Sequence, residues 1–169
     1  MTCTIESYTP GPDWENHPVT TLLHELDKTR TLADGDTFVG RAKPTNLLVT
    51  RLVAVADDNR LVGFLSGRVN AGTGDHDGLS GQIGLVEYIG VLRHHGCTMR
   101  SEPSPGDLLI RRFAEMAGEA GAEHLVLNVG ASPDELDNTR YFFARNGFTC
   151  TPAATSPNRL GKRVKQTPS

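Results

Sequence analysis

This sequence has few cysteines, nearly balanced charges and no long apolar run. Its three cysteines, Cys3, Cys97 and Cys150, are an odd number without the spacing of a metal site, so neither a disulfide framework nor a zinc module is expected. No apolar run approaches the roughly 20 residues that cross a bilayer. The first residues, MTCTIESY, have neither the basic nor the apolar region of a signal peptide. These absences predict a cytoplasmic protein with reduced thiols and no membrane partner.

The net charge and the length further restrict the class of protein. A formal net charge of −3 does not attract polyanions to the protein as a whole, which argues against non-specific binding of nucleic acid. A chain of 169 residues can bury a core of its own, and no internal repeat divides it. We expect a single domain that covers residues 1–169.

The stretch 83–148 alternates strands and helices. Residues 85–92 are mostly apolar and rich in β-branched and aromatic side chains, as in a strand covered on both faces. The sequence SPGD at 104–107 has a capping serine, a proline at the first helical position and an acid three residues after the cap. A helix is therefore expected to begin there and to end at Gly121.

A second strand and helix follow. Residues 125–129 have the pattern of a buried strand, and SPDE at 132–135 repeats the helix start. That helix should run to about Asn146, with Gly147 as its terminator.

The remaining segments are predicted from the same periodicities. They are a first strand at 2–8, a helix at 19–26, a loop or short helix at 27–46, two hairpin strands at 47–56 and 61–69, an exposed loop at 70–82 and a final strand near 159–164. The basic residues of the final strand are more typical of a solvated edge strand than of a binding patch.

Four motifs, in order, resemble those of the GNAT superfamily of N-acetyltransferases. LVGFLSGRV at 61–69 looks like the family's central hairpin strand, and EYIGV at 87–91 looks like the strand beside the acyl group. GAEHLVLNV at 121–129 looks like the next strand, and NTRYFFARNGF at 138–148 looks like the late helix. The resemblance implies an α+β (mixed α/β) fold with a central, mostly antiparallel mixed sheet of six to seven strands and about four flanking helices.

The same resemblance implies acetyl-CoA or another acyl-CoA as co-substrate, and no metal. The residues that it places beside the co-substrate are Ile89, Val91, Arg100, Ser104, Gly106, Asp107, Asn128 and Asn138. The acceptor would bind on the side of the first helices and the 27–46 segment.

Two parts of the chain depart from the family pattern. Where the family's phosphate-binding loop has glycines, this chain has Pro103 and Pro105, and proline has no N–H to donate to a pyrophosphate. Arg100 keeps the basic position of that loop. The tyrosine of the family's late helix falls on Phe143, and Tyr141 lies about 200° away around the helix, so we expect Tyr141 to face elsewhere.

Glu87, His94 and His95 are the candidate catalytic residues. Glu87 is the one charge in an apolar strand, where burial favours a general base; the alternative is a carboxylate at the solvent end of the strand or paired with an arginine. His94 and His95 follow the strand and could titrate near neutrality. No partner base for Cys97 is evident, and His76 lies in a flexible Gly/Asp-rich segment, so neither is assigned a role.

Three functions remain open. The first is an N-acyltransferase that uses acyl-CoA to acylate the amine of a small molecule by direct attack with general-base help. The second is a GNAT-fold transferase with another donor, such as an aminoacyl-tRNA or a carrier-bound acyl group. The third is a non-catalytic GNAT-like binding module. A homodimer is compatible with all three.

Overall fold

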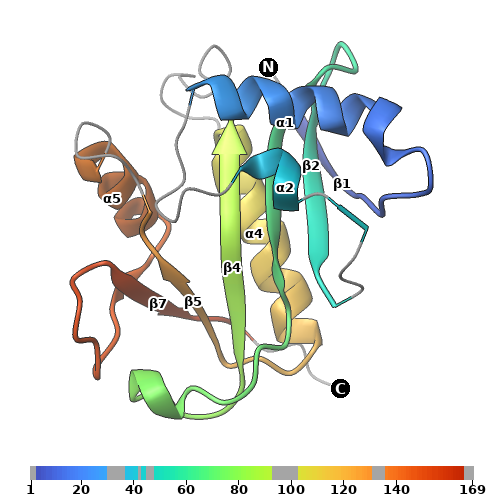
Figure 1. Ribbon diagram of the computed structural model, residues 1–169. Coiled ribbons are helices and arrows are strands. Elements are labelled where there is room, and N and C mark those ends of the chain that lie inside the picture. The colour runs from blue at the N-terminus through green and yellow to red at the C-terminus, as the bar shows by residue number, and fades with distance from the viewer. Residues whose placement is uncertain are drawn as a thin grey trace. The chain divides into compact units, whose positions relative to one another are not determined.

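The computed structural model describes residues 3–29, 37–41, 43–44, 48–92, 103–130 and 136–165 (Figure 1). In these ranges the strands are β1 (Cys3–Ser7), β2 (Thr50–Ala56), β3 (Leu61–Arg68), β4 (Ile83–Val91), β5 (His124–Asn128), β6 (Thr149–Cys150) and β7 (Arg159–Arg163). The α-helices are α1 (Pro18–Thr29), α2 (Phe38–Arg41), α4 (Pro105–Glu119) and α5 (Leu136–Arg145). No helix of the described ranges is long and apolar enough to span a bilayer.

Most of these elements match the sequence prediction with small shifts at their ends. The four-residue helix α2 lies in the segment expected to be a loop or a short helix. Gly121 and Gly147 follow their helices with φ of 94° and 90°, as glycine terminators do. The short strand β6 was not predicted, and the expected helix start at 132–135 lies outside the described residues.

The seven strands form one sheet in the order β1-β2-β3-β4-β5-β7-β6. Strands β4 and β5 are parallel, whereas the β1–β2, β5–β7 and β6–β7 pairs are antiparallel. This mixed, mostly antiparallel sheet confirms the predicted fold class. The expectation that β7 is an edge strand is wrong, because β7 pairs with β5 on one side and with β6 on the other.

Contacts between residues divide the chain into two compact units. Unit 1 consists of Met1–Ser66 and Tyr88–Arg112, and unit 2 consists of Gly67–Glu87 and Phe113–Ser169. Strands β3 and β4 and helix α4 therefore contribute residues to both units. The expectation of a single domain stays a prediction.

Unit 1 has an apolar core between its strands and helices α1 and α2. Its buried members are Val19, Leu22, Leu23, Leu26, Phe38, Val53 and Phe64. Helix α1 supplies most of them because its apolar residues recur at helical spacing. Asp27 then fixes the start of α2, since its carboxylate accepts the N–H groups of Phe38 at 2.6 Å and of Val39 at 3.1 Å.

In unit 1, helix α4 lies on the face of β3 opposite α1 and α2. A Cβ atom on Gly63 would be 3.1 Å from Cδ1 of Leu109 in α4. The next residue, Phe64, points into the α1–α2 core. Since successive side chains of a strand point to opposite faces, the two layers of helices cover opposite sides of β3.

In unit 2, glycines let the strands approach α4 closely. A Cβ atom on Gly67 would overlap the carbonyl oxygen of Leu85 and would be 2.8 Å from Cζ of Phe113. A Cβ atom on Gly84 would be 3.1 Å from Cβ of Ala117. These glycines are required by packing, because a side chain at Gly67 has no space.

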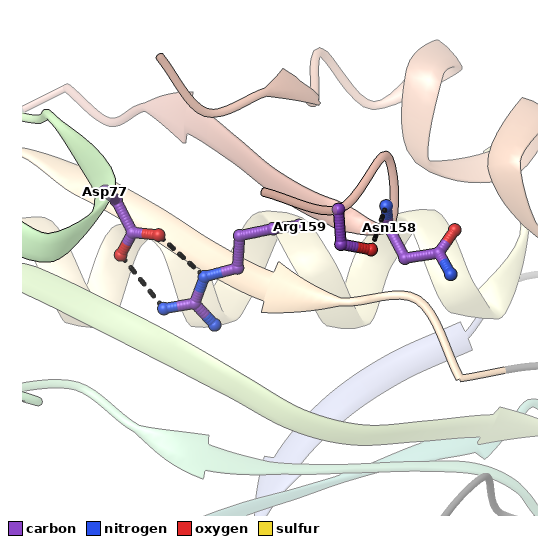
Figure 2. A network of polar contacts seen from close by, with 4 residues as sticks. Asp77, Asn158 and Arg159 are labelled. Atoms are coloured by element: carbon purple, nitrogen blue, oxygen red, sulfur yellow. Dashed lines mark hydrogen bonds and ion pairs between the residues drawn. The ribbon is translucent and has the colours of Figure 1, made fainter. Parts of the chain in front are cut away.

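The β3–β4 connection was expected to be exposed, but Asp77 within it is 6% exposed. Its carboxylate accepts hydrogen bonds from Nε and Nη2 of Arg159 at 2.7 and 2.9 Å (Figure 2). Its carbonyl oxygen accepts the N–H of Ala153 at 3.1 Å. The loop is thus fastened to β7 and to the segment before it. The prediction failed here because Asp77 gains its partner from a distant part of the sequence.

Candidate functional site

Glu87 lies in β4 directly after the part of that strand that pairs with β5. The last parallel pair joins Val86 to Leu127. The side chain of Glu87 is 21% exposed. Its Oε1 atom is buried and accepts no hydrogen bond from the residues that the structure describes. Because the carboxylate as a whole is partly exposed, it can take a proton from a bound donor.

Arg68, the last residue of β3, is the partner of Glu87. Its Nε atom lies 3.6 Å from Oε1 of Glu87, which is close enough for an ion pair and too long for a good hydrogen bond. The sequence contained a signal for this pair, since each residue is the one charge in its strand and opposite charges on adjacent strands attract each other. Pairing with an arginine was one of the alternatives left open for Glu87, and the structure shows it; which arginine could not be identified without the register of the strands.

Arg68 and Glu87 lie on the face of unit 2 that points away from α4. Gly67 faces Phe113 of α4, so the next side chain, Arg68, points to the opposite face. Glu87 meets it there. Because 41% of the Arg68 side chain is exposed, the pair contributes no more than about 1 kcal/mol to the free energy of unfolding. The main consequence of the ion pair is therefore that it orients the Glu87 carboxylate.

A capping box closes the N-terminus of α4, as the SPGD sequence predicted. The N–H of Asp107 donates to Oγ of Ser104 at 3.2 Å, and the N–H of Ser104 donates to Oδ2 of Asp107 at 2.9 Å. Pro105 occupies the first helical position, where its missing N–H costs nothing.

Few backbone N–H groups are free at this N-terminus, where Ser104, Gly106 and Asp107 were predicted to bind CoA, and that role stays a prediction. The amides of Ser104 and Asp107 are used within the cap, and Pro105 has no N–H. In the described part of the chain, Gly106 retains an N–H without a hydrogen bond. The Asp107 carboxylate, 8% exposed as a residue, also places a negative charge at this helix N-terminus.

The other predicted donor-binding residues are placed as follows. In unit 1, Ile89 and Val91 are partly exposed residues of β4. In unit 2, Asn128 is exposed at the end of β5, where it pairs with Arg159, and Asn138 is exposed in the first turn of α5. Their roles stay predictions.

Several predicted residues lie outside the described part of the chain. These are Arg100, His94, His95 and Cys97. Among the residues that are described, no group of three His, Cys, Asp or Glu side chains could hold a metal ion. His76 is exposed in the 3-10 helix Asp75–Asp77.

Helix α5 presents Tyr141 and Phe143 in different directions, as expected from their spacing. Tyr141 is 69% exposed, whereas Phe143 is 4% exposed. The Phe143 ring lies 5.6 Å from that of Phe148, centroid to centroid, in an edge-to-face contact. The hydroxyl of Tyr141 therefore does not replace the one that Phe143 lacks.

The structure is similar to solved acetyltransferases over nearly its whole length. Tetrahymena GCN5 matches with a TM-score of 0.62 and 11% identity, covering 99% of each chain. A GNAT-family acetyltransferase from Staphylococcus aureus Mu50 matches with a TM-score of 0.61 and 13% identity, covering 97% of this chain and 100% of that one. The Escherichia coli GNAT N-acetyltransferase YhbS, solved with CoA, matches with a TM-score of 0.59 and 13% identity, covering 96% of this chain and 82% of that one.

Comparisons of sequence alone found less. No protein-family model matches the chain, and no curated protein sequence matches it. The similarity is therefore one of fold. The chain has the fold of the GNAT acetyltransferases, which its sequence motifs had already indicated.

Proposed function

We propose that this protein is an N-acyltransferase that transfers an acetyl or other acyl group from acyl-CoA to the amine of a small molecule. The observation that carries the proposal is the similarity to solved acetyltransferases, which extends over at least 96% of the chain in the three comparisons above. The Glu87 carboxylate supports it, because an amine nucleophile needs a base and the Glu87 side chain is partly exposed.

The reaction proceeds by direct attack. The amine nitrogen forms a bond to the thioester carbonyl carbon, and the carbon–sulfur bond breaks to release a thiolate. Glu87 takes the proton that the nitrogen loses, directly or through one water molecule. Water protonates the thiolate, since the position of the family tyrosine is held by Phe143 and Tyr141 points elsewhere.

A thiol-release assay tests the proposal. The purified protein is incubated with acetyl-CoA, propionyl-CoA and malonyl-CoA and with a panel of primary amines, and mass spectrometry identifies the amide product. Enzyme-dependent amide formation is expected with at least one pair. Thioester hydrolysis without amide, or no reaction across the panel, would count against an acyltransferase of this kind.

The capping box favours a second candidate, a transferase of the same fold whose donor is not CoA. Ser104 and Asp107 use their own amides, so the described part of this helix start offers little to a pyrophosphate. Mass spectrometry of the protein as purified separates the candidates, since bound CoA supports the first and bound RNA the second. Comparable kcat/KM values for acetyl-CoA and S-acetylpantetheine would show that the nucleotide part of CoA is not recognised.

A further inference from the structure

The ion pair of Arg68 and Glu87 leaves both side chains with unused hydrogen-bonding capacity. Their closest atoms are 3.6 Å apart, whereas Arg159 and Asp77 of the same unit meet at 2.7 Å. Oε1 of Glu87 is buried and accepts no hydrogen bond from the described residues. A guanidinium has five N–H donors, and the contact with Glu87 is the one recorded for Arg68 within the described ranges.

The pair is also open to ligands. The Arg68 side chain is 41% exposed and that of Glu87 is 21% exposed, whereas the values for Arg159 and Asp77 are 24% and 8%. A loose pair that solvent reaches can accept a ligand between or beside its charges. The pair of Arg159 and Asp77 is tighter and less exposed, so it is less able to do so.

We propose that Arg68 and Glu87 together recognise an acceptor that carries an anionic group next to its amine, as an α-amino acid does. This inference rests on the proposed function and names the acceptor class for it. The ammonium of the acceptor donates to the exposed part of the Glu87 carboxylate, and the acceptor's carboxylate accepts N–H groups from Arg68. In an α-amino acid one carbon separates the ammonium from the carboxylate. This short separation matches the 3.6 Å between Nε of Arg68 and Oε1 of Glu87.

Electrostatics explains why the anion is needed. An alkylammonium ion bound to Glu87 would lie a few ångströms from the Arg68 guanidinium, and the two positive charges would repel each other. A carboxylate on the acceptor lies beside the guanidinium and offsets this repulsion, so that positive and negative charges alternate. Arg68 is thus a specificity-determining residue, while Glu87 takes the proton.

Binding measurements without a donor test the pair directly. Calorimetry or ligand-observed NMR compares alanine, phenylalanine, lysine and glutamate with their carboxamides, on wild-type protein, Arg68→Gln and Arg60→Gln. Arg60 is a matched control, because it is exposed and pairs with Asp58 in the β2–β3 turn. We expect the wild type and Arg60→Gln to bind at least one free acid about tenfold to a hundredfold more tightly than its amide, since a charge-assisted contact is lost in the amide.

Arg68→Gln should remove this difference by weakening the binding of the acid and strengthening that of the amide, because the repulsion between the guanidinium and the ammonium is lost. Arg68→Lys keeps the charge without the planar fork and should retain part of the preference, which guards against a Gln variant that folds poorly. Equal binding of acids and amides by the wild type, no binding of any acid, or a preference that survives in Arg68→Gln would overturn the proposal.

Turnover separates this inference from the proposed function. If neutral amines are acylated and acids are not preferred, the acceptor class is wrong and the acyltransferase remains. If acids bind through Arg68 and no thioester reacts with them, the recognition stands and the acyltransferase fails.

Discussion

Asp77 and Arg159 lie 82 positions apart in the sequence, and two hydrogen bonds of 2.7 and 2.9 Å join their side chains (Figure 2). This bidentate contact ties the β3–β4 connection to the first residue of β7. Burial raises the cost of leaving either charge alone, because a charge out of water must be paired. Removing one partner of this pair in unit 2 should therefore cost more stability than the intact pair contributes on balance.

Replacing Arg159 by methionine should destabilise the protein by about 3 kcal/mol at pH 7, since the buried Asp77 carboxylate loses its cation. Urea unfolding followed by circular dichroism measures the change. Adding Asp77→Asn to the Arg159→Met variant should recover a large part of the loss. Equal stabilities of the single variant and the wild type would contradict this role for the pair.

Acid should weaken the same contact. The hydrogen bonds from Arg159 hold the pKa of Asp77 below its ordinary value, although burial acts in the opposite direction. A carboxyl group with a lower pKa in the folded state stabilises that state above its unfolded value of about 3.9, and this contribution is lost as the pH falls through the folded pKa. The free energy of unfolding should therefore fall more steeply below about pH 4 for the wild type than for Asp77→Asn. Parallel slopes in urea titrations at several pH values would rule this out.

Gly67→Ala should destabilise the protein by about 1–3 kcal/mol, because its Cβ would overlap the backbone oxygen of Leu85. The ring of Phe113 at 2.8 Å adds to the conflict. Gly11→Ala is the matched control, since no atom lies within 4 Å of its new Cβ, and it should change stability by less than about 0.5 kcal/mol. Thermal unfolding of both variants measures the difference, and similar midpoints would show that β4 and α4 do not approach Gly67 as closely as described.

Features that depend on neighbouring residues were predictable from the sequence. The capping box of Ser104 and Asp107 and the glycine terminators Gly121 and Gly147 were identified because each depends on local backbone chemistry. The family motifs likewise gave the fold class.

Features that depend on strand register and strand order were not predictable in this way. The sequence does not show which strand lies beside β7, so it was placed at an edge. It does not show that Arg68 meets Glu87 or that Arg159 meets Asp77, because each pair joins different strands or loops. The sequence therefore identified Glu87 and allowed for an arginine partner, but it did not show which arginine.

Glu87→Gln should lower kcat by about 10²- to 10⁴-fold at pH 7 with little change in donor KM, because general-base help is lost. The deficit should shrink as the pH rises, since ammonium groups have pKa values near 10 and free amine then forms without a base. Glu119→Gln, at the exposed end of α4, is the control. Full activity of the Glu87→Gln variant at pH 7 would remove Glu87 from the mechanism and direct attention to His94 and His95.

Asp107→Ala should increase the affinity for CoA by about tenfold, because it frees the N–H of Ser104 and removes a negative charge from the helix start. The lost cap should also lower the free energy of unfolding by about 1 kcal/mol. Calorimetric titration with CoA measures the affinity. Asp137→Ala, which removes an exposed acid from the first turn of α5, serves as control. A weaker complex after Asp107→Ala would mean that the carboxylate helps to hold the donor.

The position of β7 has a consequence for how the protein is made. Strand β7 follows β5 and β6 in the chain, yet it lies between them in the sheet. While the ribosome adds residues from the N-terminus onward, the edge of β5 that β7 will cover has no partner until residues 159–163 have been synthesised. Unpaired strand edges attract other chains. The nascent protein must therefore keep this edge from associating with neighbours until translation has passed β7.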